Sequence, residues 1–338
     1  MYKAFKNPII FFLFIASLFG QWSLWSNPSL PVGESEKGVG AAKNQIIYGV
    51  QSFFSYIDWW HEPIGKENYD HKGTLNTFII KPSLVYGLNK KLNLSLNTTI
   101  GIRSMHWGVG ETSIHHRSEN TLSKFKNAHS SIFGDSKLLL RYLFKNAGMN
   151  KGFRIFGAAG LNIPSKSALT SDPFFLNDEP EQEHRHFSLS NGTFNYILES
   201  QFYYKRSLNP IFFGGFIQIE NPIKESKYGF LSPRTVNITL SAINKRFDNR
   251  DASIGYGGSL LLTGKGYWNG KVSPNTESVV FSPSLTYLVG LKFGSMAINV
   301  QKPMFLSGSF AGNEGEIKQR INAWQVGLTF RIVPNMKN

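Results

Sequence analysis

The segment Leu92-Asn93-Leu94-Ser95-Leu96-Asn97-Thr98-Thr99-Ile100 alternates apolar and polar side chains. Because successive side chains of a β-strand point to opposite faces, this period of two predicts a strand with one apolar and one polar face. The same alternation recurs over residues 235–242 and 324–332. The pattern predicts an all-β chain whose strands separate an apolar from a polar environment.

The alternation predicts about twelve strands and a regular order of connections between them. The strands cover residues 46–56, 76–86, 92–103, 133–144, 152–161, 193–204, 211–221, 234–244, 251–263, 278–288, 291–301 and 321–332. The short connections are 87–91, 145–151, 205–210, 246–250 and 289–290, and the long ones are 57–75, 104–132, 162–192, 222–233, 264–277 and 302–320. This alternation is typical of a transmembrane, antiparallel, up-and-down β-barrel with tight periplasmic turns and long outer loops. A soluble β-sandwich has the same strand period but no reason to alternate its loops.

The composition agrees with a barrel and excludes several other classes. Hydrophobic residues make up 41% of the 338 residues, yet mean hydropathy is −0.20 and no long apolar run follows the N-terminus. A helical membrane protein needs windows of about 20 apolar residues, so that class is excluded. Aromatic residues at 14% and charged residues at 17% argue against disorder. The absence of cysteine excludes disulfides and thiolate chemistry.

Residues 1–26 are expected to be a cleaved signal peptide, because Lys3 and Lys6 precede an apolar stretch over 9–18. A flexible leader over 27–44, a barrel over 45–332 and a tail over 333–338 are expected to follow. Removing Lys3 and Lys6 lowers the net charge from +14 to about +12. An exported chain does not meet the chromosome, so nucleic acid is not expected as a partner. The expected location is the bacterial outer membrane, and the expected partners are membrane lipid, lipopolysaccharide, the barrel assembly machinery and a small-molecule solute.

Taking the apolar parity as lipid-facing assigns a set of charged and aromatic side chains to the lumen. The candidates are Lys81, Arg103, Asp135, Lys137, Arg141, Arg154, Glu199, Phe212, Phe216, Glu220 and Arg331, with Phe53 and Phe156 on the same parity. The excess of cations would favour anionic solutes. Alternatively, the charges pair with one another and brace or plug the barrel. The inward phenylalanines are either a path for a hydrophobic solute or tight packing.

No catalytic residue, metal site or cofactor is predicted. His115-His116 lies in a loop, and His184 and His186 follow an acidic run, but neighbouring loop residues fix no coordination geometry. His129-x-Ser131 and His186-x-Ser188 match only a fragment of the arrangement used by outer-membrane phospholipase barrels. Trp59-Trp60 falls in the first long loop of the predicted layout.

Several local motifs carry a family resemblance. They are Gly134-Asp135 with Arg141-Tyr142, Gly160-Leu161-Asn162-Ile163-Pro164-Ser165, Ser190-Asn191-Gly192-Thr193-Phe194-Asn195-Tyr196, Ser282-Pro283-Ser284-Leu285-x-Tyr287 and Asn299-Val300-Gln301-Lys302-Pro303. In this order they resemble motifs of the bacterial outer-membrane family assigned to transport in the phenol-degradation meta-cleavage pathway, and they span most of residues 75–332. Departures are Ser165-Lys166 for Thr-Gly, Asn195 for Asp, and a chain that continues past Ile332. The resemblance implies an outer-membrane barrel with a transport role.

The sequence therefore predicts an outer-membrane channel for the passive passage of small solutes, hydrophobic or aromatic ones among them. The alternative is a non-transporting outer-membrane surface protein whose long loops bind an external partner.

Overall fold

The computed structural model describes residues 37–38, 40–63, 69–108, 118–146, 151–173, 183–205, 212–243, 252–274, 276–291, 294–308, 311 and 318–334. The strands that form the barrel wall are β1 (Ile46–His61), β2 (His71–Gly87), β3 (Leu92–Trp107), β5 (Phe133–Asn146), β6 (Gly152–Ile163), β7 (Asn195–Lys205), β8 (Phe212–Pro222), β10 (Thr235–Ile243), β11 (Ala252–Thr263), β14 (Ser278–Leu291), β15 (Gly294–Gln301) and β17 (Gln319–Ile332). No helix in the described ranges is long and apolar enough to cross a membrane.

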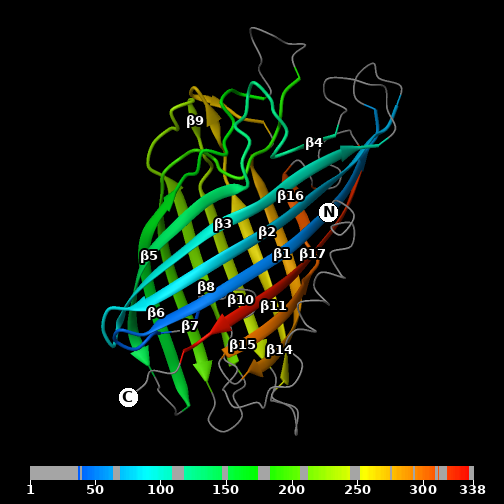
Figure 1. The fold of residues 1–338 in the computed structure, drawn as a ribbon. Coiled ribbons are helices and arrows are strands. Elements are labelled where there is room, and N and C mark those ends of the chain that lie inside the picture. The colour runs from blue at the N-terminus through cyan, green and yellow to red at the C-terminus, as the bar shows by residue number, and fades with distance from the viewer. Residues whose placement is uncertain are drawn as a thin grey trace, which may run out of the picture.

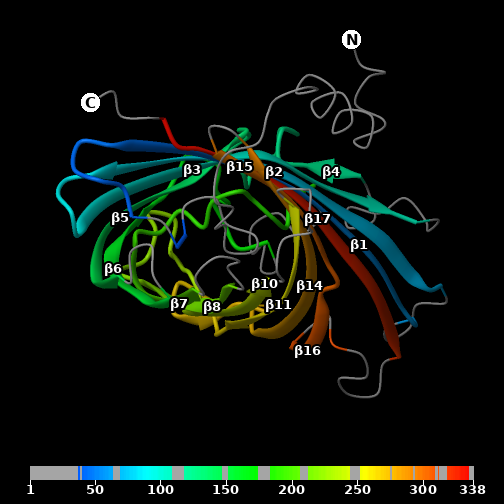
Figure 2. The ribbon, with the colours of Figure 1, turned by 90° about the horizontal axis from the view of Figure 1, so that it is seen from below.

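These strands close into a ring. Each pairs antiparallel with its neighbour along the chain, β11 pairs with β14 across the intervening loop, and β1 pairs with β17 to close the sheet. Figure 1 shows the tilted strands from the side, and Figure 2 shows the ring from below. The predicted twelve-stranded up-and-down barrel is confirmed. Closure pairs the strands of the wall with one another, as a lipid environment requires, apart from residues 319–324 of β17, which within the described residues pair on one side only.

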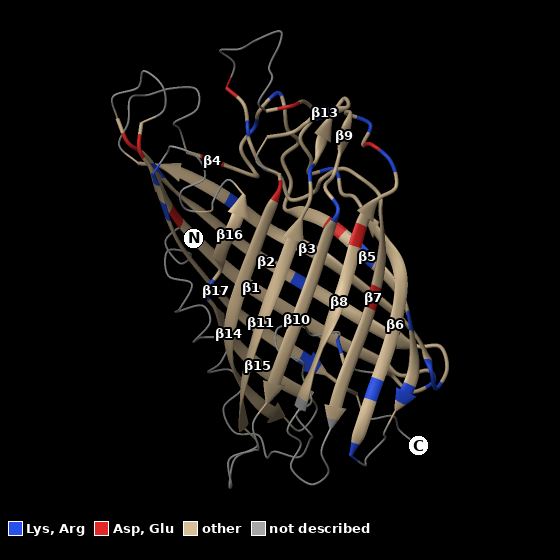
Figure 3. Ribbon diagram, turned by 180° about the vertical axis from the view of Figure 1, so that it is seen from behind, with Lys and Arg blue, Asp and Glu red and all other residues tan. Residues whose placement is uncertain are grey.

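Strand parity divides the side chains between the two faces of the wall. Asn93 and Ser95 of β3 are fully buried, whereas Leu96, the residue after Ser95, is 42% exposed. Leu198 and Leu285 are likewise half exposed on the outer face. Charged residues gather at the barrel ends and in the loops, with few in the middle of the strands (Figure 3). The outer face is thus an apolar band of the kind that faces lipid.

The first long loop is shorter than predicted, because β1 continues to His61 and β2 begins at His71. Trp59 and Trp60 therefore lie in a strand, and their assignment to a loop is wrong. Above the apolar band the outward positions no longer face acyl chains, so polar residues such as Asp58 interrupt the alternation without ending the strand. The other long connections carry five short strands: β4 (Glu119–Asn120), β9 (Phe230–Leu231), β12 (Tyr267–Trp268), β13 (Lys271–Val272) and β16 (Met304–Gly308).

The described end of the expected leader enters the barrel. Ala41 packs with Ile47 and Val85, and Val333 covers this cluster from the C-terminal tail. The Asn44 amide donates to the Gly87 carbonyl over 2.7 Å, which ties the segment to the first short turn. The expected signal peptide lies outside the described residues, as do residues 27–36 and 335–338.

Candidate functional site in the barrel lumen

A buried charge cluster joins the N-terminal segment to the barrel wall. The Lys37 ammonium forms an ion pair with the Glu199 carboxylate, and Arg141 Nη2 donates to the other oxygen of Glu199 over 3.1 Å. Gln201 also donates to Glu199, and the Lys37 ammonium lies 4.4 Å from the centre of the Phe216 ring. The side chains of all three ionised residues are 0–1% exposed. Charges removed from water in this way are tolerated only when paired and hydrogen-bonded, as here.

Backbone groups of residues 37–41 are bound from several strands. The Gly38 amide donates to Gln201 Oε1 over 2.9 Å, and Arg154 donates to the Gly38 carbonyl over 3.1 Å. Arg331 donates to the Lys37 carbonyl over 2.8 Å. Because β6, β7 and β17 contribute these groups, the segment crosses the lumen and narrows it in the half nearer the short turns.

A second polar layer lies nearer the long loops, on the wall built by β5 to β8. Lys137 forms an ion pair of 2.8 Å with Glu220, and Asn195 donates to the other oxygen of Glu220 over 2.8 Å. Asn162 donates to Asp135 over 2.9 Å. These cross-strand contacts are those expected of a network that braces the wall.

The structure places the predicted lumen residues as follows. Lys81, Arg103, Asp135, Lys137, Arg141, Arg154, Glu199, Phe216, Glu220 and Arg331 share the strand parity of the buried inner positions. Phe156 and Phe216 are almost fully buried, which is the packing alternative rather than an open path. The Phe212 side chain lies outside the described part of the structure.

Sequence reasoning missed Lys37, Gln201 and Asn93. Gln201 and Asn93 lie on the inner parity of predicted strands, so parity applied to uncharged polar residues would have found them. Asn93 Oδ1 accepts from the Ala41 amide over 2.8 Å. Lys37 lies in a Gly- and Ser-rich segment without periodicity, and no local signal marks it as buried.

The opposite wall, built by β17, β1 and β2, presents two apolar groups to the lumen, separated by the inward polar residues Ser55, Thr77 and Gln325. Phe53 lies opposite Ile79 in the register, and Ile57 lies between Leu75 and Ala323. We call these five inward residues the apolar lane. Lys81, whose ammonium is 5.3 Å from the Phe53 ring centre, marks its end nearer the short turns.

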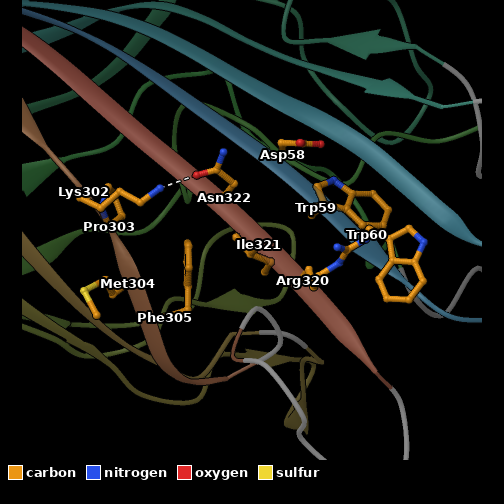
Figure 4. A pocket seen from close by; sticks show the side chains of 10 residues that line it. All are labelled: Asp58, Trp59, Trp60, Lys302, Pro303, Met304, Phe305, Arg320, Ile321 and Asn322. Carbon is orange, nitrogen blue, oxygen red and sulfur yellow. Dashed lines mark hydrogen bonds between the residues drawn. The ribbon is translucent and has the colours of Figure 1, made fainter.

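The lane leads to an interruption in the wall. β15 pairs with β17 only over residues 325–332, and β16 pairs with β14. Within the described residues, 319–324 therefore have no strand partner on the side away from β1. A cavity of about 670 Å³ occupies this place, which we call the wall gap (Figure 4). Its lining is Asp58, Trp59, Trp60, Lys302, Pro303, Met304, Phe305, Arg320, Ile321 and Asn322.

The wall gap receives side chains of both parities. Trp59 and Ile321 are inward neighbours directly above the apolar lane, whereas Trp60 and Arg320 belong to the outward parity. Trp59 packs edge-on against Trp107 with ring centres 4.9 Å apart. The gap is thus lined from both faces of the wall, and its inward residues are the next inward positions after the lane.

The long loops form an ordered cap around Arg185, which is fully buried. Its guanidinium donates to the carbonyls of Asn120, Ser123 and His129 over 3.3, 3.3 and 2.8 Å. Asn127 exchanges two hydrogen bonds of 2.9 Å with the Arg185 backbone. Burial lowers the pKa of Arg185 from its ordinary value, and the charge of Glu119 opposes that shift.

The histidine fragments take part in loop packing. His129 Nε2 lies 2.8 Å from the Tyr228 hydroxyl, and the Ser188 hydroxyl donates to the Ser190 carbonyl over 2.6 Å. His186 lies 3.2 Å from both Glu119 and His184. Among the described residues, no group of three or more His, Cys, Asp or Glu could hold a metal ion, and His115-His116 falls outside that part.

The barrel is similar to a crystal structure of an outer membrane channel from Pseudomonas putida F1, with 13% identity and a TM-score of 0.56 over 93% of this chain and 100% of that one. Weaker likenesses are to the P. putida toluene transporter TodX (6% identity, TM-score 0.42, 88% and 92% coverage) and a Pseudomonas aeruginosa FadL homologue (8%, 0.40, 91% and 100%). No protein-family model and no curated protein matches the sequence. The first likeness shows that this chain has the fold of an outer-membrane channel.

Proposed function

We propose that this protein is an outer-membrane channel for the passive passage of small hydrophobic solutes, aromatic ones included. The observation that carries the proposal is the apolar lane, which is followed along β1 and β17 by inward residues that line the wall gap. Phe53 and Ile57 are the partly exposed residues of the lane, and burying their apolar surface against a hydrophobic solute releases about 25 cal/mol per Å².

The polar contents of the lumen support the same proposal. Residues 37–41 narrow the axial route through the lumen. The charges of Lys37 and Arg141 are both paired with the carboxylate of Glu199. A hydrophilic solute would have to displace these contacts, whereas a hydrophobic solute can follow the opposite wall. The excess of cations in the sequence is thus better assigned to bracing than to attraction of anionic solutes.

The family resemblance of the motifs and the fold shared with an outer membrane channel point in the same direction. Membership of the phenol-degradation transport family is part of this proposal. The exported, membrane-inserted state with a cleaved signal peptide is also part of it, as are assembly by the barrel machinery and contact with lipopolysaccharide.

Uptake by cells with an intact outer membrane tests the proposal. Ile79→Asn places an amide in the lane and should slow uptake of a labelled monoaromatic hydrocarbon several-fold. Ile197→Asn is the matched control, because Ile197 is also buried and inward but lies on the wall opposite the lane. Equal uptake by the two variants, each shown to be folded by its heat-modifiable electrophoretic migration, would remove the lane from the route.

The alternative of a loop-binding surface protein makes the opposite prediction. It has in its favour the ordered cap around Arg185, which is a defined surface at the outer end. In that case planar bilayers would show no conductance, and cells making the protein would take up no more solute than cells without it.

A further inference from the structure

The outer rim of the wall gap carries two cations held against outward tryptophans. The Lys302 ammonium lies 4.3 Å from the centre of the Trp324 ring, and the Arg320 guanidinium carbon lies 5.0 Å from that of Trp60. Lys302 also donates to the side chain of Asn322. Figure 4 shows Lys302 and Arg320 approaching the cavity from its two sides. We call Lys302, Arg320, Trp60 and Trp324 the cationic ledge.

The height of the ledge is that of lipid headgroups. Trp324 is about eight residues above Ile332 at the opposite end of β17, and a strand tilted by about 40° rises about 2.5 Å per residue, so Trp324 lies about 20 Å up the apolar band. That band is about 25 Å tall, which places the tryptophan near its outer margin. By the same measure Arg320 lies about 10 Å above Trp324, at the level of the lipid phosphates.

The ledge faces the membrane rather than the lumen. Trp60, Trp324 and Arg320 share the outward parity of Tyr48, Val326 and Ile332, which are exposed on the lipid-facing surface. Toward the short turns from Lys302 and Trp324, the outward residues Val326, Val300 and Ile298 are exposed apolar side chains. An acyl chain could lie on this surface while its headgroup meets the cations.

The charge balance favours an anion. Among the described residues, neither Lys302 nor Arg320 is within ion-pair distance of a carboxylate. Asp58 lines the same cavity, and Asp70 accepts a 2.9 Å hydrogen bond from Trp60 Nε1. Lys72 lies beside Trp60 in the register and adds a third cation to the outward row. Arginine and lysine are the side chains that bind phosphate.

We infer that the cationic ledge binds the phosphate of an outer-leaflet lipid, whose acyl chain lies against Trp324 and Val300 beside the wall gap. The inference rests on membrane insertion but not on transport. A solute on the transport route would contact the inward residues, and the outward parity of the ledge therefore favours a lipid of the leaflet itself.

Native mass spectrometry of the detergent-solubilised full chain tests the site, with bisphosphorylated lipid A as the probe. Lys302→Gln and Arg320→Gln should each weaken binding roughly tenfold, the usual effect of losing a charged hydrogen bond. Lys91→Gln is the matched control, because Lys91 lies 6.0 Å from the Tyr142 ring centre at the opposite end of the barrel. Unaltered heat-modifiable migration shows that each variant is folded.

Three results would overturn the inference. One is equal binding by the double variant and the Lys91→Gln control. Another is equal binding of dephosphorylated lipid A, which would show that the acyl chains alone are recognised. The third is full displacement by millimolar inorganic phosphate, which would indicate a site for free anions. If a variant loses lipid binding but keeps solute uptake, the inferred lipid site and the proposed channel function are separate, and the function is unaffected. If the barrel binds lipid A but takes up no solute, the proposed function is wrong and the lipid site is still supported.

Discussion

Replacing Lys37 by methionine should open the lumen without unfolding the barrel. The substitution keeps an unbranched side chain over Phe216 and removes the ion pair with Glu199. Glu199 retains Arg141 at 3.1 Å and its bond from Gln201, so its charge stays compensated. Removing one partner of a buried ion pair costs about 3–5 kcal/mol. Because residues 37–41 keep their backbone bonds, the lower end of this range is expected.

A loss of about 3 kcal/mol shifts the ratio of undocked to docked segment about 100-fold, since about 1.4 kcal/mol corresponds to a factor of ten. Single-channel recording in planar bilayers should therefore show a similar rise in the frequency of large-conductance openings. Lys43→Met is the matched control, because Lys43 is exposed in the same segment. If Lys37→Met and Lys43→Met give the same openings in equally folded barrels, the charge cluster does not hold the segment in the lumen.

Three further predictions concern the segment, the wall and the cap. Gly87→Ala should loosen the same segment and raise conductance, because a Cβ there would lie 1.9 Å from the Ala42 carbonyl oxygen; Gly327→Ala, which meets nothing nearer than 3.5 Å, should have no effect on the recordings. Arg141→Met should lower the melting temperature, since Glu199 loses one of its two cations at a cost of about 3 kcal/mol, and an unchanged thermal transition would contradict this. Asn127→Ala removes both bonds to the Arg185 backbone, each worth about 1 kcal/mol, and should speed trypsin cleavage in the loops; cleavage at the wild-type rate would show that the cap does not depend on Asn127.

The strand pattern could be predicted because lipid acts on every strand in the same way. The alternation of Leu94, Leu96 and Ile100 with polar neighbours gave both the strand and its orientation, and the closed ring follows from the absence of a free edge. The alternation failed at Trp59-Trp60, where the strand rises above the apolar band and the outward parity no longer has to be apolar.

The site could be predicted only in part. Parity placed Glu199 and Arg141 on the same inner face, but their pairing depends on the register of β5, β6 and β7, which no local pattern specifies. Lys37 contacts Glu199, which is 162 residues away in the sequence, and the segment that contains Lys37 shows no alternation of apolar and polar residues. The wall gap depends on the shortness of β15, which ends where Lys302-Pro303 interrupts the pairing with β17.

The central claim is that a hydrophobic solute crosses the outer membrane through this barrel. Its most direct test is the initial rate of uptake of a labelled monoaromatic hydrocarbon, at micromolar concentration, by diderm cells with and without the protein. A hydrophilic sugar of similar size serves as the second solute. Uptake of the hydrocarbon should be faster in cells that carry the folded barrel, with little change for the sugar. Equal hydrocarbon uptake with and without the inserted barrel would contradict it.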